Sequence, residues 1–100
     1  MSNAVWLISY KLIKGTSVED FLRASEKCNN EVLSKKKGFI SWKVLVDGDE
    51  WVDICTWETM EDAINAETDN GEPDSAAQEF YSFIDPDSLK HQVFSVEKTY

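Results

Sequence analysis

This 100-residue sequence contains no basic residues over much of its second half. No lysine or arginine occurs between Val44 and Leu89, whereas the same stretch contains fourteen aspartates and glutamates. A field of this sign repels phosphate backbones and anionic lipids, so we expect neither a nucleic acid nor a membrane as partner. The simplest consequence is a hydrated acidic face that promotes solubility, and cation binding is the alternative.

Glycine, histidine and cysteine are also scarce, and each shortage removes a class of chemistry. The four glycines form neither a phosphate-binding loop nor a dinucleotide fingerprint, and no Gly-x-Ser-x-Gly elbow is present. One histidine and two distant cysteines supply neither a zinc site nor a disulfide framework. We therefore expect no haem, flavin, nicotinamide or metal cofactor, and reduced thiols at Cys28 and Cys55.

Long apolar runs are missing as well. No run approaches the roughly 20 residues of a membrane-spanning helix, and the start of the chain lacks the basic and apolar regions of a signal peptide. We expect a cytoplasmic protein. The length is that of one domain, residues 1–100, with a core that subunit association would help to stabilise.

What is present is organised around residues 38–58, which have the pattern of a β-hairpin. Two runs rich in β-branched and aromatic residues flank a turn signal at Asp47-Gly48. Two registers remain open, because a loop of two or four residues and a loop of three place opposite sets of residues on one face. Trp51, Asp53 and Trp57 share a face in the first case with Ile40, Trp42 and Val44, and in the second with Phe39, Ser41 and Lys43.

The remaining segments complete an α+β pattern. Residues 5–13 and 91–100 have the alternation of strands, and the capping motifs at Thr16-Ser17-Val18-Glu19, Thr59 and Ser75 start three predicted helices. Residues 67–74 form a polar, turn-rich break that we interpret as a flap. The order strand, helix, strand, strand, helix pair, strand predicts a ferredoxin-like β-α-β-β-α-β fold, with a four-stranded antiparallel sheet and helices on one face.

Three consecutive lysines precede the hairpin. We expect Lys35, Lys36 and Lys37 to lie against the negative end of the first helix dipole, and Gly38 to form its left-handed cap. Phosphate binding by the same lysines is the alternative interpretation.

The predicted strands carry apolar residues on both faces, whereas the helices can cover only one. We therefore expect a homodimer in which two sheets pack face to face to form a dimeric α+β barrel.

Several motifs resemble the antibiotic biosynthesis monooxygenase-like branch of the dimeric α+β barrels, and within it an uncharacterised subgroup of small stand-alone proteins. They are Lys37-Gly38-Phe39, Trp51-Val52-Asp53-Ile54, Trp57-Glu58-Thr59, Glu61-Asp62-Ala63 and the run from Phe80 to Pro86. This resemblance covers nearly the whole chain. It implies a cofactor-independent oxygenase of aromatic compounds, a haem-degrading enzyme or a protein without such activity.

The haem-degrading branch does not fit the residues of this chain. That branch uses an asparagine on its first strand together with a tryptophan and a histidine in its second helical region. Here the first strand has no asparagine beyond Asn3, and the second helical region contains neither tryptophan nor histidine. The resemblance to the oxygenase branch implies a cavity between sheet and helices, near which Asn65 and Tyr81 fall.

Asp53 is the candidate catalytic residue, since it is an acid in the middle of an apolar strand with Trp51 and Trp57 on its face. A desolvated carboxylate has a raised pKa and can act as a general base. The alternatives are a partly hydrated face, or a cross-strand pair with Lys43 or Lys11.

His91 and Tyr10 can join Asp53 in a polar cluster inside a cavity, although a single histidine at the start of a strand is commonly a surface residue. Tyr10, Trp51, Trp57, Asn65 and Tyr81 are the candidate ligand-binding residues. The sequence leaves two functions open: an enzyme or binder of a small aromatic ligand, and a non-catalytic dimeric scaffold. Because of the acidic stretch, we expect such a ligand to be neutral or only weakly anionic.

Overall fold

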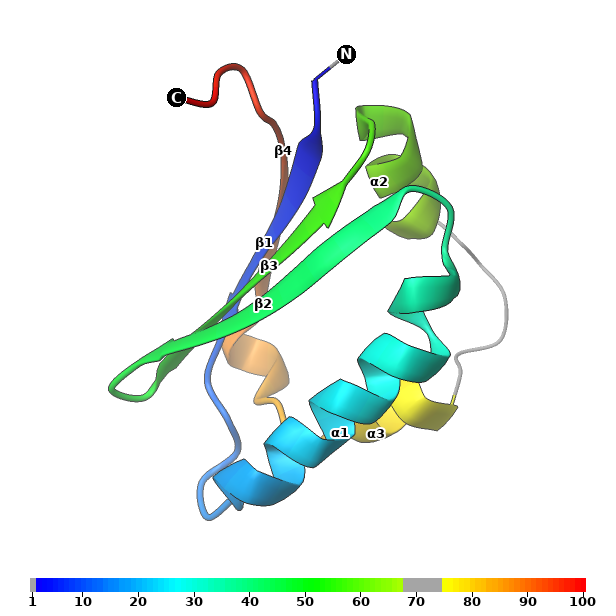
Figure 1. The fold of residues 1–100 in the computed structure, drawn as a ribbon. Coiled ribbons are helices and arrows are strands. Elements are labelled where there is room, and N and C mark those ends of the chain that lie inside the picture. The colour runs from blue at the N-terminus through cyan, green and yellow to red at the C-terminus, as the bar shows by residue number, and fades with distance from the viewer. Residues whose placement is uncertain (1, 68–74) are drawn as a thin grey trace.

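The computed structural model describes residues 2–67 and 75–100. Its strands form one antiparallel sheet in the order β2-β3-β1-β4, and the helices lie on one side of that sheet (Figure 1). This arrangement confirms the predicted ferredoxin-like fold class. The strands are β1 (Ala4–Tyr10), β2 (Phe39–Asp47), β3 (Glu50–Trp57) and β4 (Lys90–Ser95).

Three α-helices and two short 3-10 helices connect the strands in the described part of the chain. They are α1 (Val18–Glu31), η1 (Leu33–Lys35), α2 (Met60–Glu67), α3 (Ser75–Ser82) and η2 (Pro86–Ser88). The interpretation of residues 67–74 as a flap falls, from residue 68 onward, outside the described residues. None of the described helices is both long and apolar enough to cross a membrane.

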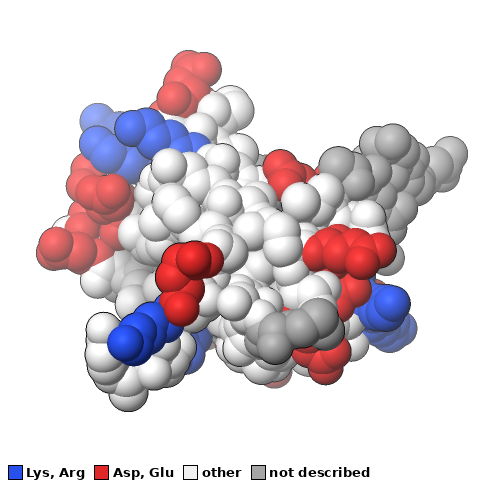
Figure 2. Space-filling view, turned by 90° about the horizontal axis from the view of Figure 1, so that it is seen from above, with Lys and Arg blue, Asp and Glu red and all other residues white. Residues whose placement is uncertain are grey.

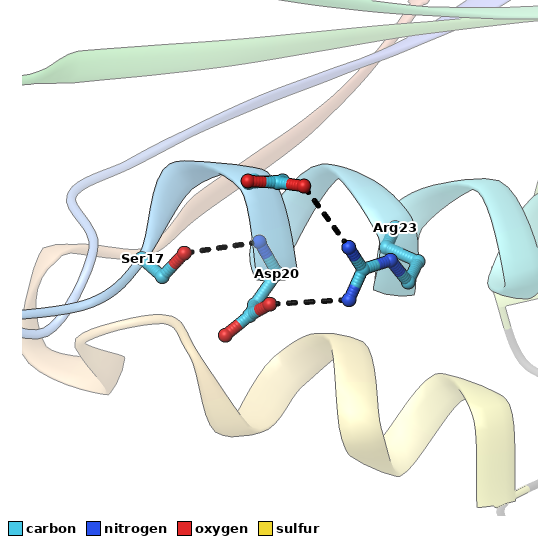
Figure 3. Close-up of polar contacts among 4 residues, drawn as sticks. Ser17, Asp20 and Arg23 are labelled. Carbon is cyan, nitrogen blue, oxygen red and sulfur yellow. Dashed lines mark hydrogen bonds and ion pairs between the residues drawn. The ribbon is translucent and has the colours of Figure 1, made fainter.

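The first turn of α1 is held by its own side chains (Figure 3). Ser17 is the N-cap, and its hydroxyl oxygen accepts a hydrogen bond of 3.2 Å from the backbone N–H of Asp20. The cap is thus one residue later than the predicted Thr16. Arg23 bridges the same turn with ion pairs to Glu19 and Asp20 at 3.1 and 3.2 Å, which contribute little because they are exposed.

The other end of α1 differs from the prediction. The helix ends at Glu31 with Val32 as C-cap, and its last turn contains no basic residue. The three lysines follow in η1 and the loop after it, so their predicted role at the α1 dipole is wrong. Gly38 does adopt a positive φ of 80°, but it leads into β2 instead of capping α1. Its carbonyl oxygen accepts a 2.8 Å hydrogen bond from Glu58, which joins the two ends of the hairpin.

The hairpin loop selects one of the two registers. Asp47 pairs with Glu50, which leaves a loop of two residues, and Gly48 takes the positive φ of 63° that fits the first position of a type II′ turn. This register places Val44 opposite Asp53. Asp53 therefore shares the helix-covered face of the sheet with the even-numbered residues of β2.

A β-bulge interrupts β2 near its start, between Phe39 and Ser41. The extra residue reverses the alternation of side chains beyond the bulge. Phe39 consequently pairs with Trp57, and their ring centroids lie 5.6 Å apart. The even-numbered pattern had placed Ile40 on this face instead.

Aromatic rings fill much of the space between sheet and helices. Phe21 of α1 stacks on Phe80 of α3 with centroids 5.2 Å apart, and its edge contacts Trp51 of β3 at 5.1 Å. Trp6 of β1 lies against Trp57 at 4.7 Å. Such pairs add specific geometry to the burial of large apolar surfaces, which anchors α1 and α3 to the sheet.

The opposite face of the sheet carries apolar residues from every strand, together with polar ones such as Lys43 and Gln92, and no described helix covers it (Figure 1). Leu45 and Phe94 on this face are 43% and 44% exposed. The strand pairings place further apolar residues on the same face: Val5, Leu7, Val52 and Ile54.

Charged side chains are dispersed on the face seen from above (Figure 2). Acidic and basic residues lie mainly around its edge, and a broad uncharged area separates them. On this face the acids do not merge into one continuous patch.

Candidate functional site

A cavity of about 590 Å³ lies between the sheet and the helices. Its floor is formed by side chains from all four strands: Trp6, Ile8, Trp42, Asp53, Cys55 and His91. Residues from α1, η1, α2 and α3 form the other walls, among them Cys28, Leu33, Ala66, Ala77, Phe80 and Tyr81. A volume of this size is within the range of small-molecule sites.

Asp53 is the most deeply buried charged residue on the cavity wall, with 1% of its surface exposed. It lies in β3, a central strand of the sheet, between Val44 of β2 and Ile8 of β1. The hydroxyl of Tyr10 donates a 2.7 Å hydrogen bond to its Oδ1 atom. The Oδ2 atom accepts no hydrogen bond from a described residue, so one carboxyl oxygen is left for a bound molecule.

Burial raises the pKa of Asp53 from 3.8 to about 7. The hydrogen bond from Tyr10 favours the ionised form and offsets part of this effect, as does the nearby indole N–H of Trp42 to a smaller degree. Desolvation and the neighbouring Asp53 carboxylate raise the pKa of Tyr10, so its hydroxyl stays protonated and remains a donor. An acid with a pKa near neutrality can both accept and return a proton.

Trp42 also contributes a polar group without a partner. Its Nε1 atom is buried and makes no hydrogen bond to a described residue, because its approach to Asp53 does not reach hydrogen-bond geometry. The environment of the carboxyl group is therefore one hydroxyl donor at close range, one indole donor slightly displaced, and no cation. No ion pair to Asp53 forms within the described residues, and Lys11 pairs instead with Asp49 at 3.6 Å.

His91 and Tyr81 lie at more open parts of the cavity wall. His91 is exposed, and its ring meets Trp6 edge-on with centroids 5.1 Å apart. Ile8 pairs with both His91 and Asp53, so these two residues are two strands, or about 10 Å, apart. Tyr81 is 48% exposed, yet desolvation around its hydroxyl raises its pKa to about 12.

The structure separates the other candidate binding residues from this cavity. Trp51 and Trp57 share the face of Asp53 but pack into the aromatic core and do not line the cavity. Tyr10 contacts the site through Asp53. Asn65 is exposed on α2 and lines a separate, smaller hollow.

Sequence reasoning did not assign several of the lining residues to the site. Trp42 follows from the register once the two-residue loop is known, since it then shares the face of Asp53. Cys28 and Cys55, which form no disulfide, are buried and line the cavity. Burial raises the pKa of the Cys55 thiol, which disfavours the reactive thiolate. No local signal placed Lys35 and Lys36 on the wall, because they approach it from a loop distant in sequence.

The charges that face the cavity differ from those of the acidic stretch as a whole. Of the fourteen acids between Val44 and Leu89, only Asp53 and Glu67 belong to the described lining. Glu31, Lys35 and Lys36 join them from the end of α1 and from η1. Among the described residues, no group of histidine, cysteine and acidic side chains is arranged to hold a metal ion.

Comparison with solved structures identifies the fold class. SnoaB, a cofactor-independent oxygenase from Streptomyces nogalater, superimposes with a TM-score of 0.75 at 15% identity, covering 99% of this chain and 97% of its own. A candidate antibiotic biosynthesis monooxygenase from Bacillus cereus gives a TM-score of 0.65 at 23% identity, covering 100% and 98%. A haem-degrading protein from Mycobacterium tuberculosis gives 0.63 at 17% identity, covering 99% and 96%.

The chain thus has the fold of the antibiotic biosynthesis monooxygenase-like proteins, as the motif resemblance predicted. No family model matches the sequence. No curated protein matches it either. At these identities the similarity concerns the fold, and the chemistry has to be argued from the residues of this chain.

Proposed function

We propose that the protein is a monooxygenase-like enzyme without a cofactor, which acts on a small aromatic molecule with an uncharged ring system. The observation that carries this proposal is Asp53, a buried carboxyl group with a pKa near 7 on the wall of a 590 Å³ cavity. The fold shared with a cofactor-independent oxygenase supports it. Trp6, Phe80 and Tyr81 give the cavity the aromatic walls that a flat ring system prefers.

The proposed reaction begins with proton removal by Asp53. Its Oδ2 atom takes a proton from an acidic C–H or O–H group of the substrate, while Tyr10 holds Oδ1. The resulting electron-rich anion reduces molecular oxygen directly. For a substrate CH₂ group, the balanced outcome is a carbonyl group and one water molecule, with dioxygen as the oxidant and the substrate as the source of all electrons.

Within this proposal, His91 relays the proton taken by Asp53 to the oxygen atom that leaves as water. It lies at the edge of the cavity on the far side of Ile8 from Asp53, and it is exposed to water. The distance of two strands requires a water molecule or the substrate itself to connect the two groups.

Oxygen uptake measured with wild-type protein and variants tests the function. A thermal-shift screen of neutral aromatic compounds first selects molecules that bind, since a ligand that binds only the folded state raises the melting temperature. Asp53→Asn is then expected to bind the same compounds with oxygen uptake reduced by a factor of about 100 or more, as expected for the loss of a general base. Asp47→Asn, which alters an exposed acid on the same hairpin, is the control.

Two results would contradict the proposal. Undiminished oxygen uptake by Asp53→Asn would remove Asp53 from the reaction. A complete lack of binding in the aromatic screen would favour the non-catalytic dimeric scaffold, for which the aromatic residues serve only as core.

A further inference from the structure

A second hollow, of about 280 Å³, adjoins the cavity at the junction of η1 and α2. We call it the lysine pocket, and its lining is Lys35, Lys36, Lys37, Asp62, Asn65 and Ala66. Lys35, Lys36 and Ala66 also belong to the lining of the main cavity. The two hollows are therefore adjacent and share these three residues as a common wall.

The clustering of lysines in this pocket is not explained by helix capping. The lysines do not cap α1, because that helix ends at Glu31, before them. Lys35 and Lys37 form no ion pair with a described residue, although the chain carries nineteen acids against ten basic residues. Holding like charges together without a partner costs free energy, which a bound anion would offset.

Asp62 is the one acid in the lysine pocket. It is 7% exposed, its backbone N–H donates to Thr59 Oγ1 at 3.0 Å, and its side chain packs against Gly38, where a Cβ atom would overlap it. Lys35 and Lys37 alone outnumber this carboxylate, so the described lining of the pocket is net positive without counting Lys36. Asn65 adds an amide group that can donate a hydrogen bond without adding charge.

We propose that the lysine pocket binds an anionic group, a phosphate or a carboxylate, attached to the molecule whose ring system occupies the main cavity. The second half of this statement depends on the proposed function, whereas the anion site itself does not. A lysine suits such a shared wall, because its aliphatic stem can pack along an apolar cavity while its ammonium group reaches a neighbouring polar site.

This proposal departs from the expectation of a neutral or weakly anionic ligand. Most of the described acids that motivated that expectation line neither hollow, and Asp53 is the acid at the proposed ring end of the ligand. The ligand is then an aromatic compound with an uncharged ring and an acidic group at one end.

Calorimetric titration with matched probes tests this site. The probes are naphthol, naphthoic acid, naphthyl phosphate and inorganic phosphate, all at one fixed ionic strength so that general screening is constant. The test variant is Lys35→Ala with Lys37→Ala. Its control is Lys14→Ala with Lys90→Ala, which removes the same charge at two exposed lysines outside both hollows.

Wild-type protein is expected to bind naphthyl phosphate or naphthoic acid roughly tenfold more tightly than naphthol. The test variant should lose most of this preference, with a much smaller loss of affinity for naphthol, and the control variant should keep the preference. A preference for the acid that persists in the test variant, or equal binding of all three compounds by the wild type, overturns the proposal.

Inorganic phosphate separates this proposal from the proposed function. Phosphate binding that disappears only in the test variant supports the anion site even if no naphthyl compound binds, and in that case the aromatic cavity function fails alone. If neither inorganic phosphate nor any acidic probe binds to the wild type, the lysine pocket is not an anion site.

Discussion

At the scale of the residue, burial of Asp53 disfavours its ionised form, and the hydrogen bond from Tyr10 offsets part of this effect. Transfer of a carboxylate out of water costs free energy. A single hydroxyl donor at 2.7 Å does not fully offset the free energy needed to keep the buried group ionised. The group responds by keeping its proton up to a pKa of about 7. This is the usual physical origin of an acid or base that works near neutral pH.

We predict that Asp53→Asn stabilises the protein at pH 8. Between pH 4 and pH 7 the folded state binds a proton that the unfolded chain, with a pKa near 3.8, has already released. Wild-type stability therefore falls as the pH rises through this window, and it is constant above it. Since one pKa unit corresponds to about 1.4 kcal/mol, the variant should gain a few kcal/mol at pH 8 and almost nothing at pH 4.

Urea denaturation of both proteins at pH 4, 6 and 8 measures this difference, with Asp47→Asn as the exposed control. A gain in the free energy of unfolding that does not change with pH would show that Asp53 does not titrate in this window. A change within about 0.5 kcal/mol at pH 8 would mean that the carboxylate is hydrated in the folded state.

At the scale of the element, the connection from η1 into β2 depends on close contact with α2. Gly38 has a φ of 80°, which few residues other than glycine adopt, and a Cβ atom there would overlap the Asp62 side chain. The same contact positions η1 and its lysines beside α2. The geometry of the lysine pocket is thus tied to one glycine.

We predict that Gly38→Ala destabilises the protein more than Gly48→Ala does. Both glycines have a positive φ, so both substitutions incur a backbone cost of about 1 kcal/mol. Only Gly38 faces an obstacle, since a Cβ atom at Gly48 meets no atom within 4 Å. Overpacking at Gly38 should add roughly 1–3 kcal/mol to the loss, measured by urea denaturation. Equal losses would show that Asp62 moves away without cost.

At the scale of the whole molecule, the sheet is covered by helices on one face and open on the other. The open face presents the apolar residues of all four strands, and large exposed apolar patches commonly mark an interface. We propose a homodimer in which this face meets its counterpart in a second copy, which would complete an α+β barrel.

We predict that Leu45→Lys on the open face converts the dimer into a folded monomer. Burying an unpaired lysine at such an interface costs more free energy than the apolar contacts there contribute to association. Leu22→Lys is the matched control, because Leu22 is similarly exposed, at 42%, but lies on α1. Light scattering after gel filtration reports the mass of each protein. A wild-type monomer at micromolar concentration, or a Leu45→Lys dimer, would contradict the proposed interface.

The order and type of the elements were predictable from the sequence because their signals are local. Alternating apolar residues, the helix cap at Thr59 and the Asp47-Gly48 turn each depend on a few neighbouring residues. Together they predicted the ferredoxin-like fold that the structure confirms. The position of Asp53 as an acid in an apolar strand was equally visible. A polar cluster of Asp53 with Tyr10 was among the interpretations of the sequence, but the direct hydrogen bond and the near-complete burial of Asp53 were decided by the fold, because Tyr10 lies on another strand, 43 residues away.

The site itself was decided by tertiary structure. The two-residue loop selected the register that puts Trp42 on the face of Asp53, a choice that the alternation of residues left open, and the bulge in β2 then placed Phe39 instead of Ile40 on that face. Packing of α1 then placed Trp51 in the core, away from the cavity. The lysines reached α2 because α1 ended earlier than its sequence suggested, and such contacts depend on how whole elements pack, which no local pattern encodes.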